Sequence, residues 1–318
     1  MRLYLCEKPS QAKDIAAVLG ASRRGDGCWL GNGVTVTWCI GHLLETAPPD
    51  AYDEKYKRWV LADLPIVPEK WKMRVKPKTA SQYKAVKRLL GEAQELVIAS
   101  DADREGEMIA RELVEHCRYR GPIQRLWLSA LDDASIRKAL AALKPGAETF
   151  SLYHSALGRS RADWLIGMNM SRLFTLLGRQ SGYQGVLPVG RVQTPTLRLV
   201  VDRDRSIADF VPVAYWAIDV DLRHEHMTFT AQWRAAEDAC DDQGRCLNPQ
   251  LAREAADAMS NAANARLTKL RTERMREVAP LPFDLGTLQE ICSKKLGLGA
   301  QETLDIAQSL YETHKVIT

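Results

Sequence analysis

The acidic stretch Asp101-Ala102-Asp103-Arg104-Glu105-Gly106-Glu107 follows directly on the apolar run Leu96-Val97-Ile98-Ala99-Ser100. Such a run predicts a buried strand, and ligands of open α/β sheets bind where the strands end. While the chain stays extended, the alternation of Asp101, Asp103 and Glu105 directs their carboxylates to one side. Clustered carboxylates repel one another unless a hard cation such as Mg²⁺ lies among them. The stretch therefore predicts a magnesium site, with a solvated acidic helix N-terminus as the alternative.

Another buried strand is predicted over residues 2–6, and Glu7 and Lys8 follow it directly. If the two strands are neighbours, Glu7 lies beside the carboxylates of Asp101 and Asp103. Lys8 can then neutralise a phosphate as a point charge. This prediction depends on the two strands being neighbours, because a glutamate–lysine pair by itself does not indicate a binding site.

Strands and helices alternate along the first half of the chain. Strands are predicted at 2–6, 34–40 and 96–100, with helices after Pro9, after Ala80 and around Ile109, and an irregular excursion at 44–80. This alternation predicts a mostly parallel, Rossmann-like α/β sheet.

The second half of the chain begins at the turn sequence Lys144-Pro145-Gly146. Helices are predicted at 150–175, 196–207, 251–263 and 285–313 (the last broken near Gly297), strands at 215–222, 227–231 and from Lys315, and a glycine-rich loop at 178–195. The length of the chain alone suggests two or three domains, or several lobes that share one chain.

Composition excludes several classes of protein. The 318 residues are 46% hydrophobic and 26% charged, which is ordinary for a soluble globular protein. No apolar run approaches the roughly 18 residues of a membrane span, and the start lacks a signal peptide, so a cytoplasmic location is expected. The seven cysteines contain no CxxC pair, which disfavours a disulfide framework. His224, His226, Cys240 and Cys246 fit no common zinc spacing.

The net charge of +4 is unevenly distributed. Residues 154–205 contain no lysine and no glutamate, and they carry eight arginines: 159, 161, 172, 179, 191, 198, 203 and 205. Arginine without lysine favours planar, bidentate recognition of phosphate. A solvated helix face is the alternative interpretation.

The acidic stretch and Glu7 together resemble the Toprim domain of topoisomerases, primases and some nucleases. Four further stretches resemble the type IA DNA topoisomerases: Gly41-His42-Leu43-Leu44-Glu45, the RADWLIGMNMSR run at 161–172, Val189-Gly190-Arg191-Val192-Gln193-Thr194-Pro195, and residues 280–312. Pro188 stands where the family often has serine. Within the family, residues 7–13 and 183–187 favour the topoisomerase III kind.

The resemblance implies a fold and a set of site residues. The implied fold has four domains: an α/β Toprim domain (1–148), a mainly helical DNA-binding lobe (149–212), part of a β-rich arch (213–278) and the start of a helical, winged-helix-like nucleophile domain (279–318). Glu7, Asp101 and Asp103 would hold Mg²⁺ with Glu105 in or near its shell, and Lys8 would act on the scissile phosphate. The implied DNA contacts are Trp59, Arg159, Arg161, Trp164, Arg172, Arg179, Pro188, Val189, Gly190, Arg191, Val192 and Gln193.

Elementary chemistry agrees with several of these contacts. A glycine-rich loop lets backbone approach a strand closely, and the guanidinium groups of Arg172, Arg179 and Arg191 can fork onto phosphates. Trp59 and Trp164 can stack on unpaired bases, although packing in a core is an equally good reading of each tryptophan. Asp163 is expected to order Arg161.

The resemblance also implies a reaction. A tyrosine attacks single-stranded DNA to form a 5′-phosphotyrosine, a second strand passes, and the break is resealed with Mg²⁺ but without ATP. The absence of a P-loop agrees with this. In the family, the segment resembling residues 310–318 runs into the catalytic tyrosine, so the nucleophile is expected just after Thr318. Tyr311 lies in an apolar helical pattern, which predicts a structural role for it.

Residues 1–318 alone are therefore expected to be a monomer that binds Mg²⁺ and DNA without cutting. Two other functions remain open from the sequence. A Toprim nuclease or primase would release free ends or make primers, and a non-catalytic DNA-binding remnant would bind DNA without magnesium.

Overall fold

The computed structural model describes residues 1–317 and forms two compact units. The larger unit contains residues 1–197 together with the chain from Phe283 onward, and the smaller unit contains Arg198–Pro282. The division of the chain into four domains stays a prediction.

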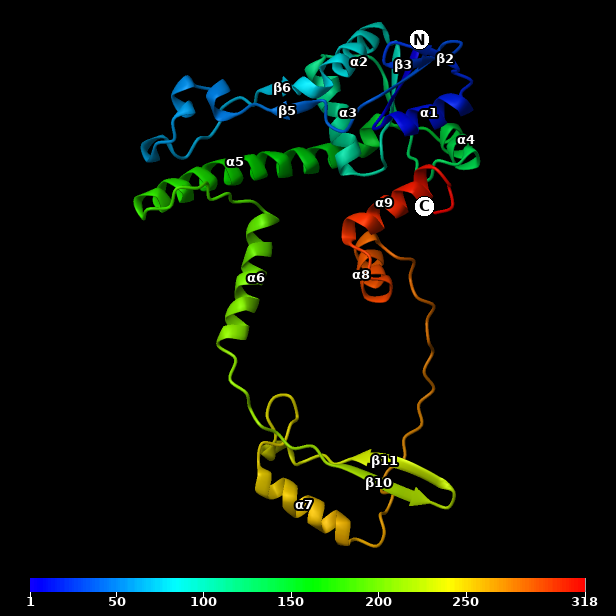
Figure 1. Ribbon diagram of the computed structural model, residues 1–318. Coiled ribbons are helices and arrows are strands. Elements are labelled where there is room, and N and C mark those ends of the chain that lie inside the picture. The colour runs from blue at the N-terminus through cyan, green and yellow to red at the C-terminus, as the bar shows by residue number, and fades with distance from the viewer. Residues whose placement is uncertain (318) are drawn as a thin grey trace. The chain divides into compact units, whose positions relative to one another are not determined.

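A mixed, mostly parallel sheet forms the centre of the larger unit (Figure 1). Its strands, in spatial order, are β2 (Arg23–Gly25), β3 (Cys28–Leu30), β4 (Val34–Trp38), β1 (Arg2–Cys6), β7 (Glu95–Ala99), β8 (Ile123–Arg125) and β9 (Lys144–Pro145). The central strands β4, β1, β7 and β8 are parallel, and antiparallel strands lie at both edges. The predicted α/β fold is confirmed.

Alternation along β1 and β7 explains why helices cover both faces of the sheet. Leu3 and Leu5 pack with α2 (Ala80–Glu92) and α3 (Arg104–His116) in one core cluster. Tyr4 and Cys6 pack with α1 (Pro9–Val18) and α4 (Asp133–Ala141) in another. Side chains of a strand point alternately to opposite faces, so a strand that is apolar at every position is buried between two helical layers.

A long excursion leaves the sheet and lies along helix α5 (Phe150–Gln180) (Figure 1). Its base is the two-stranded pair β5 (Leu44–Thr46) and β6 (Met73–Val75), and its tip contains the short 3₁₀ helices Pro49–Ala51, Glu54–Lys57 and Leu61–Asp63. Asn169 of α5 accepts a hydrogen bond from Ile66 N at 2.6 Å and donates one to Ile66 O at 2.9 Å. The excursion is thus more ordered than its composition predicts, because α5 supplies partners for its backbone.

Helix α6 (Gln193–Ala208) begins three residues earlier than predicted. Pro195 lies in its first turn, where the missing N–H has no helical partner to lose. Helices α8 (Leu285–Leu296) and α9 (Ala300–Glu312) are separated by Gly297, which ends α8 at a φ of +70°. The strand predicted from Lys315 is wrong for residues 315–317, because Lys315 has a φ of +55°, outside extended backbone. Thr318 lies outside the described residues.

The smaller unit contains the hairpin β10 (Asp219–His224) and β11 (Met227–Gln232), followed by helix α7 (Pro249–Asn261). The strand predicted from Tyr215 begins only at Asp219, since Trp216 makes an isolated bridge with Cys246 instead of pairing with β11. No helix within residues 1–317 combines the length and the apolar character that a membrane crossing requires.

Candidate active site and nucleic-acid interface

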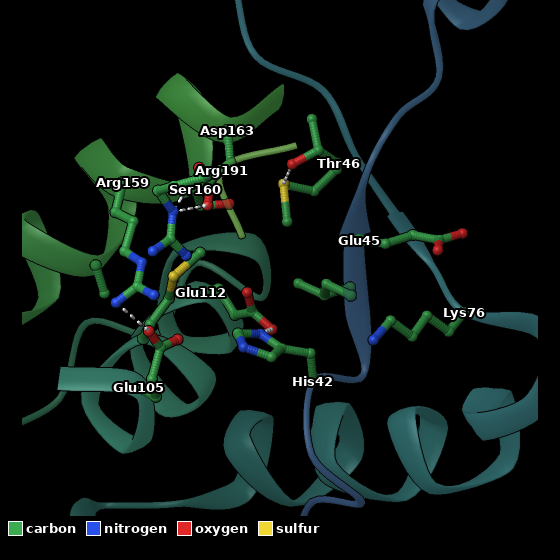
Figure 2. A pocket seen from close by; sticks show the side chains of 14 residues that line it. His42, Glu45, Thr46, Lys76, Glu105, Glu112, Arg159, Ser160, Asp163 and Arg191 are labelled. Atoms are coloured by element: carbon green, nitrogen blue, oxygen red, sulfur yellow. Dashed lines mark hydrogen bonds and ion pairs between the residues drawn. The ribbon is translucent and has the colours of Figure 1, made fainter. Parts of the chain in front are cut away.

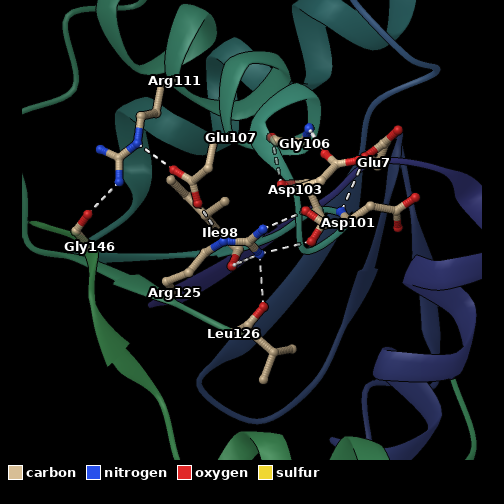
Figure 3. Close-up of polar contacts among 11 residues, drawn as sticks. Glu7, Ile98, Asp101, Asp103, Gly106, Glu107, Arg111, Arg125, Leu126 and Gly146 are labelled. Atoms are coloured by element: carbon tan, nitrogen blue, oxygen red, sulfur yellow. Dashed lines mark hydrogen bonds and ion pairs between the residues drawn. The ribbon is translucent and has the colours of Figure 1, made fainter. Parts of the chain in front are cut away.

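Glu7 and Asp101 meet where strands β1 and β7 end (Figure 3). The two strands are parallel neighbours, with Cys6 opposite Ala99. The backbone N–H of Asp101 donates to Glu7 Oε2 at 3.1 Å. Gln11, on α1, joins them by accepting from Glu7 N at 2.9 Å and donating to Asp101 Oδ1 at 3.0 Å. Glu7 and Asp101 are therefore adjacent, as predicted from the sequence, whereas the bridging role of Gln11 was not predicted.

Asp103 caps helix α3 and ends the extended part of the acidic stretch. Its Oδ1 accepts from Gly106 N at 2.7 Å, and its backbone is still extended. Glycine at 106 is required because a Cβ there would clash with the carbonyl of Asp101. Helical geometry starts at Arg104, so Glu105 lies in the first turn of α3. The expected alternation of three carboxylates on one side therefore stops at Asp103, and Glu105 faces the pocket described below.

Repulsion and burial both act on Glu7. Burial raises the pKa of its carboxyl, and the neighbouring charges of Asp101 and Asp103 raise it further. Among residues 1–317, neither Glu7, Asp101 nor Asp103 has an ion-pair partner. Carboxylates of this kind suit a hard divalent cation. Within residues 1–317, however, no three acidic, histidine or cysteine side chains converge closely enough to enclose a metal.

A fully buried ion-pair network supports the turn that carries Asp101 (Figure 3). Glu107 is 0% exposed and accepts from Arg125 Nε at 2.5 Å and from Arg111 Nε at 2.6 Å. Arg125 also donates to the carbonyls of Ser100 at 2.8 Å and Asp101 at 2.6 Å. The four-residue spacing of Glu107 and Arg111 is a sequence signal for their ion pair. The sequence around Arg125 contains no comparable signal for its ion pair with Glu107, which lies 18 residues away.

Lys8 points toward α9 of the larger unit. Its Nζ lies 3.5 Å from Glu312 Oε1 and 5.4 Å from the centre of the Tyr311 ring. Tyr311 packs against the core cluster of β1 and α1. The expectation that Tyr311 is structural agrees with this packing.

A pocket of about 400 Å³ lies beside the acidic turn, between α3, α5 and the segment around β5 (Figure 2). Arg159 contacts Glu105 at 4.0 Å in this pocket, and Arg191 donates to Asp163 at 2.9 and 3.2 Å. The pocket combines cations and carboxylates, and its charged lining residues are Glu45, Lys76, Glu105, Glu112, Arg159, Asp163 and Arg191. Asp163 was expected to order Arg161, but the two lie two positions apart on α5 and cannot face one another.

The partly exposed His42 pairs with the buried Glu112 in the same pocket (Figure 2). His42 Nδ1 lies 3.0 Å from Glu112 Oε1, and Glu112 Oε2 has no hydrogen-bond partner among the described residues. Burial lowers the pKa of His42, but the hydrogen bond and the charge of Glu112 outweigh it, so the pKa is raised overall. Burial raises the pKa of Glu112. The pair therefore retains a proton at a pH where a free histidine has lost it.

We expect the NMR titration of His42 to show a midpoint above the ~6.5 of an unperturbed histidine. His116 is the internal control, because burial and then the charge of Lys87 lower its pKa. Glu112→Gln should bring the His42 midpoint below ~6.5, since burial then dominates. The contribution of the pair to stability is complete below about pH 6.5 and is lost as the pH rises through the raised pKa. An unchanged midpoint in Glu112→Gln would contradict this assignment.

The predicted DNA-binding residues separate into exposed and enclosed groups. Arg172 is 5% exposed, donates to Tyr56 O at 3.0 Å and lies 5.2 Å from the Trp59 ring centre. Its predicted fork onto a phosphate is not available in this position, because the excursion covers its guanidinium group. Arg179 is exposed and lies 6.0 Å from the same ring.

Trp164 and Arg161 pack against the base of the excursion. Trp164 makes edge contacts with Trp71 and Tyr52, at 5.4 and 5.9 Å between ring centres. Arg161 stacks on Trp71 at 5.3 Å, and within residues 1–317 its buried Nε finds no hydrogen-bond partner. These aromatic contacts leave Trp164 half-buried and outside the core clusters of the described residues. The role of both residues in DNA binding stays a prediction.

The loop at residues 188–193 is held at one end and open at the other. Val189 N donates to Ser171 Oγ at 2.8 Å, and Gly190 N donates to Thr194 Oγ1 at 3.1 Å. Pro188, Arg191, Val192 and Gln193 are exposed. The loop therefore presents side chains next to Arg159 while α5 fixes its backbone.

Comparisons with known proteins bear on the whole chain. Residues 2–131 match the Toprim domain family, and residues 147–318 match the family described as DNA topoisomerase. DNA topoisomerase 3 of Vibrio cholerae is 44% identical over 100% of this chain and 51% of that protein. DNA topoisomerase 3 of Salmonella typhimurium is 46% identical over 100% of this chain and 50% of that protein.

A solved structure of similar fold agrees with these matches. Full-length topoisomerase I from Thermotoga maritima superposes with a TM-score of 0.66 and 25% identity, over 98% of this chain and 46% of that chain. The chain thus spans about half the length of the curated relatives it matches. Because the DNA topoisomerase family matches more than half of the sequence and the Toprim domain most of the remainder, the chain belongs to the type IA DNA topoisomerases, of the topoisomerase III kind.

Proposed function

We propose that this chain supplies the magnesium- and DNA-binding part of a topoisomerase III. The complete enzyme would cleave, pass and reseal single-stranded DNA through a 5′-phosphotyrosine, without ATP. It would act as a monomer in the cytoplasm, where bacterial DNA lies. The observation that carries the proposal is the meeting of Glu7 and Asp101 at two adjacent strand ends, beside a pocket lined by arginines.

Glu7, Asp101 and Asp103 would hold Mg²⁺, with Glu105 near its outer shell. One carboxylate oxygen of each residue accepts a hydrogen bond: Glu7 from Asp101 N, Asp101 from Gln11 Nε2, and Asp103 from Gly106 N. The other oxygen of each is left for a ligand. The ion would supply charge neutralisation at the phosphate when the break is resealed.

The chain's own residues bind and orient the DNA. Lys8 lies one residue beyond Glu7, so its ammonium group can reach a phosphate held at the strand ends once it leaves Glu312. Arg159, Arg179 and Arg191 can contact phosphates along α5 and the 188–193 loop. Gln11 and Arg125 keep the two strand ends in place through their bonds to Asp101.

The proposal is tested on an end-labelled oligonucleotide with the complete gene product. A covalent protein–DNA adduct that needs no ATP, and resealing that needs Mg²⁺, would support a topoisomerase. Free ends without an adduct, or primer synthesis, would favour a Toprim nuclease or primase. A polypeptide of residues 1–318 should bind single-stranded DNA and form no adduct, and magnesium-independent binding would favour a non-catalytic DNA-binding remnant.

Replacing Arg159 with alanine should weaken single-stranded DNA binding and lower its dependence on salt. Each phosphate contact contributes a slope of about 0.7 in a plot of log affinity against log salt concentration for single strands. Arg159→Ala and Arg191→Ala should each reduce the slope by about that amount. Arg88→Ala is the matched control, because Arg88 lies on α2 and donates to Asp26 O. If the slope of log affinity against log salt concentration is the same in all three variants, the DNA does not bind at Arg159 and Arg191.

A further inference from the structure

Two cysteines of the smaller unit face each other across a short hairpin. Cys240 and Cys246 form an antiparallel β-bridge, and both are free thiols. Cys246 is 3% exposed, whereas Cys240 is partly exposed. Neither cysteine belongs to the proposed magnesium or DNA site.

The turn between the cysteines is tightly fixed. Asp241 N donates to Arg245 O at 3.1 Å, and Asp241 Oδ1 accepts from the backbone of Gln243 at 3.0 Å and of Arg245 at 2.9 Å. The Arg245 guanidinium group also binds Asp241 Oδ2 at 2.7 Å. Gly244 adopts a φ of +74°, which suits a short hairpin loop. These contacts favour the register in which Cys240 lies opposite Cys246.

This register places the cysteines at a position suited to a disulfide. Asp241 and Arg245 form the hydrogen-bonded pair, so Cys240 and Cys246 form the next, non-hydrogen-bonded pair. Such pairs have Cα atoms about 4.5 Å apart and side chains on one face. Disulfides span Cα distances of about 4.4–6.8 Å. A third strand segment holds the other edge of Cys246, because Trp216 N donates to Cys246 O at 2.9 Å.

A metal site is a poorer interpretation of the same cysteines. His224 and His226 lie at the turn end of the β10–β11 hairpin, with His224 opposite Met227. Cys246 pairs with Trp216, which precedes β10. His224 lies eight positions beyond Trp216, a span of roughly 26 Å at the rise of a strand. The histidines and the cysteines are therefore at opposite ends of the hairpin.

We propose that Cys240 and Cys246 form a redox modification site, which glutathione disulfide converts to an intramolecular disulfide. The partly exposed Cys240, as its thiolate, attacks glutathione disulfide, forms a mixed disulfide and releases one glutathione. Cys246 then attacks the Cys240 sulfur, and the second glutathione leaves. Two protein thiols are oxidised, one glutathione disulfide is reduced to two glutathione molecules, and these carry away the two thiol protons.

Peptide mapping of the 318-residue chain under defined glutathione ratios tests this site. Trypsin cuts after Arg234, Arg245 and Arg253, so the two cysteines fall on separate peptides, 235–245 and 246–253. We expect these peptides to be joined without reductant and separated by it. In urea the joined pair should require a glutathione ratio about tenfold more oxidising, because the turn no longer holds the thiols together.

Single serine variants distinguish the order of the two steps. Cys246→Ser should leave glutathione attached to Cys240, whereas Cys240→Ser should leave the buried Cys246 unmodified. Cys292→Ser, on helix α8, is the matched control and should form the joined pair as the wild type does. Separate glutathione adducts on both cysteines of the wild type, or a link to any other cysteine, would overturn the proposal. So would the absence of a joined pair at a ratio that modifies Cys292.

Discussion

Replacing Glu107 with glutamine is expected to lower the free energy of unfolding by about 3–5 kcal/mol, because two guanidinium groups would lose the buried carboxylate that pairs with both. Glu107 and Arg125 are both 0% exposed, and the Arg111 side chain is 6% exposed. Glutamine has nearly the same shape, but its amide nitrogen would face an N–H donor of one arginine. The variant therefore isolates charge and hydrogen bonding from packing. Chemical denaturation, followed by circular dichroism, measures the loss.

Glu95→Gln is the matched control for this effect. The Arg2–Glu95 pair has the same chemistry and a similar distance of 2.6 Å, but its side chains are 43% and 21% exposed. An exposed pair contributes about 1 kcal/mol or less, since water and salt screen it. If the two variants lose the same free energy of unfolding, the buried Glu107 network stabilises the fold no more than the exposed Arg2–Glu95 pair does. The Glu107→Gln variant should also loosen the Asp101 turn, because Arg125 holds the Asp101 carbonyl.

Strands β1, β4 and β7 and helices α1, α2 and α3 were predictable from local sequence, whereas β2, β3, β8, β9 and α4 were not predicted. Continuous apolar runs at residues 2–6 and 96–100 indicated strands buried on both faces, and the structure places them side by side. The ends of these strands then placed Glu7 next to Asp101, because parallel neighbours end at the same edge of the sheet. The apolar pattern within each strand, together with the assumption that the two strands are neighbours, is enough to bring these two carboxylates together.

Other features depend on contacts between distant segments and could not be predicted. Glu105 does not lie with Asp101 and Asp103, because Asp103 caps α3 and the helix begins at Arg104, one residue before Glu105. Arg172 is covered because the excursion folds back along α5, which no local pattern indicates. His42 and Glu112 lie 70 residues apart in sequence and meet only in the fold. Tertiary packing decided each of these positions.

Replacing Asp103 with asparagine is expected to weaken Mg²⁺ binding about 10–100-fold or more without unfolding α3. Asparagine caps helices as well as aspartate does, so the hydrogen bond from Gly106 N can persist while one negative charge is lost. Asp101→Asn and Glu7→Gln should have effects of the same size, because each removes a charge from the same cluster. Isothermal titration calorimetry with Mg²⁺, or paramagnetic resonance with Mn²⁺ as a probe, measures the affinity.

Asp132→Asn provides the matched control, because Asp132 caps α4 through Ser135 N as Asp103 caps α3 through Gly106 N. Both substitutions exchange one N-cap for another, and only one of them lies at the paired strand ends. If both variants bind Mg²⁺ as the wild type does, the carboxylates at the strand ends do not hold the ion. If Asp103→Asn alone loses affinity and both keep their thermal unfolding midpoints, the loss follows from the charge of Asp103 and not from the cap.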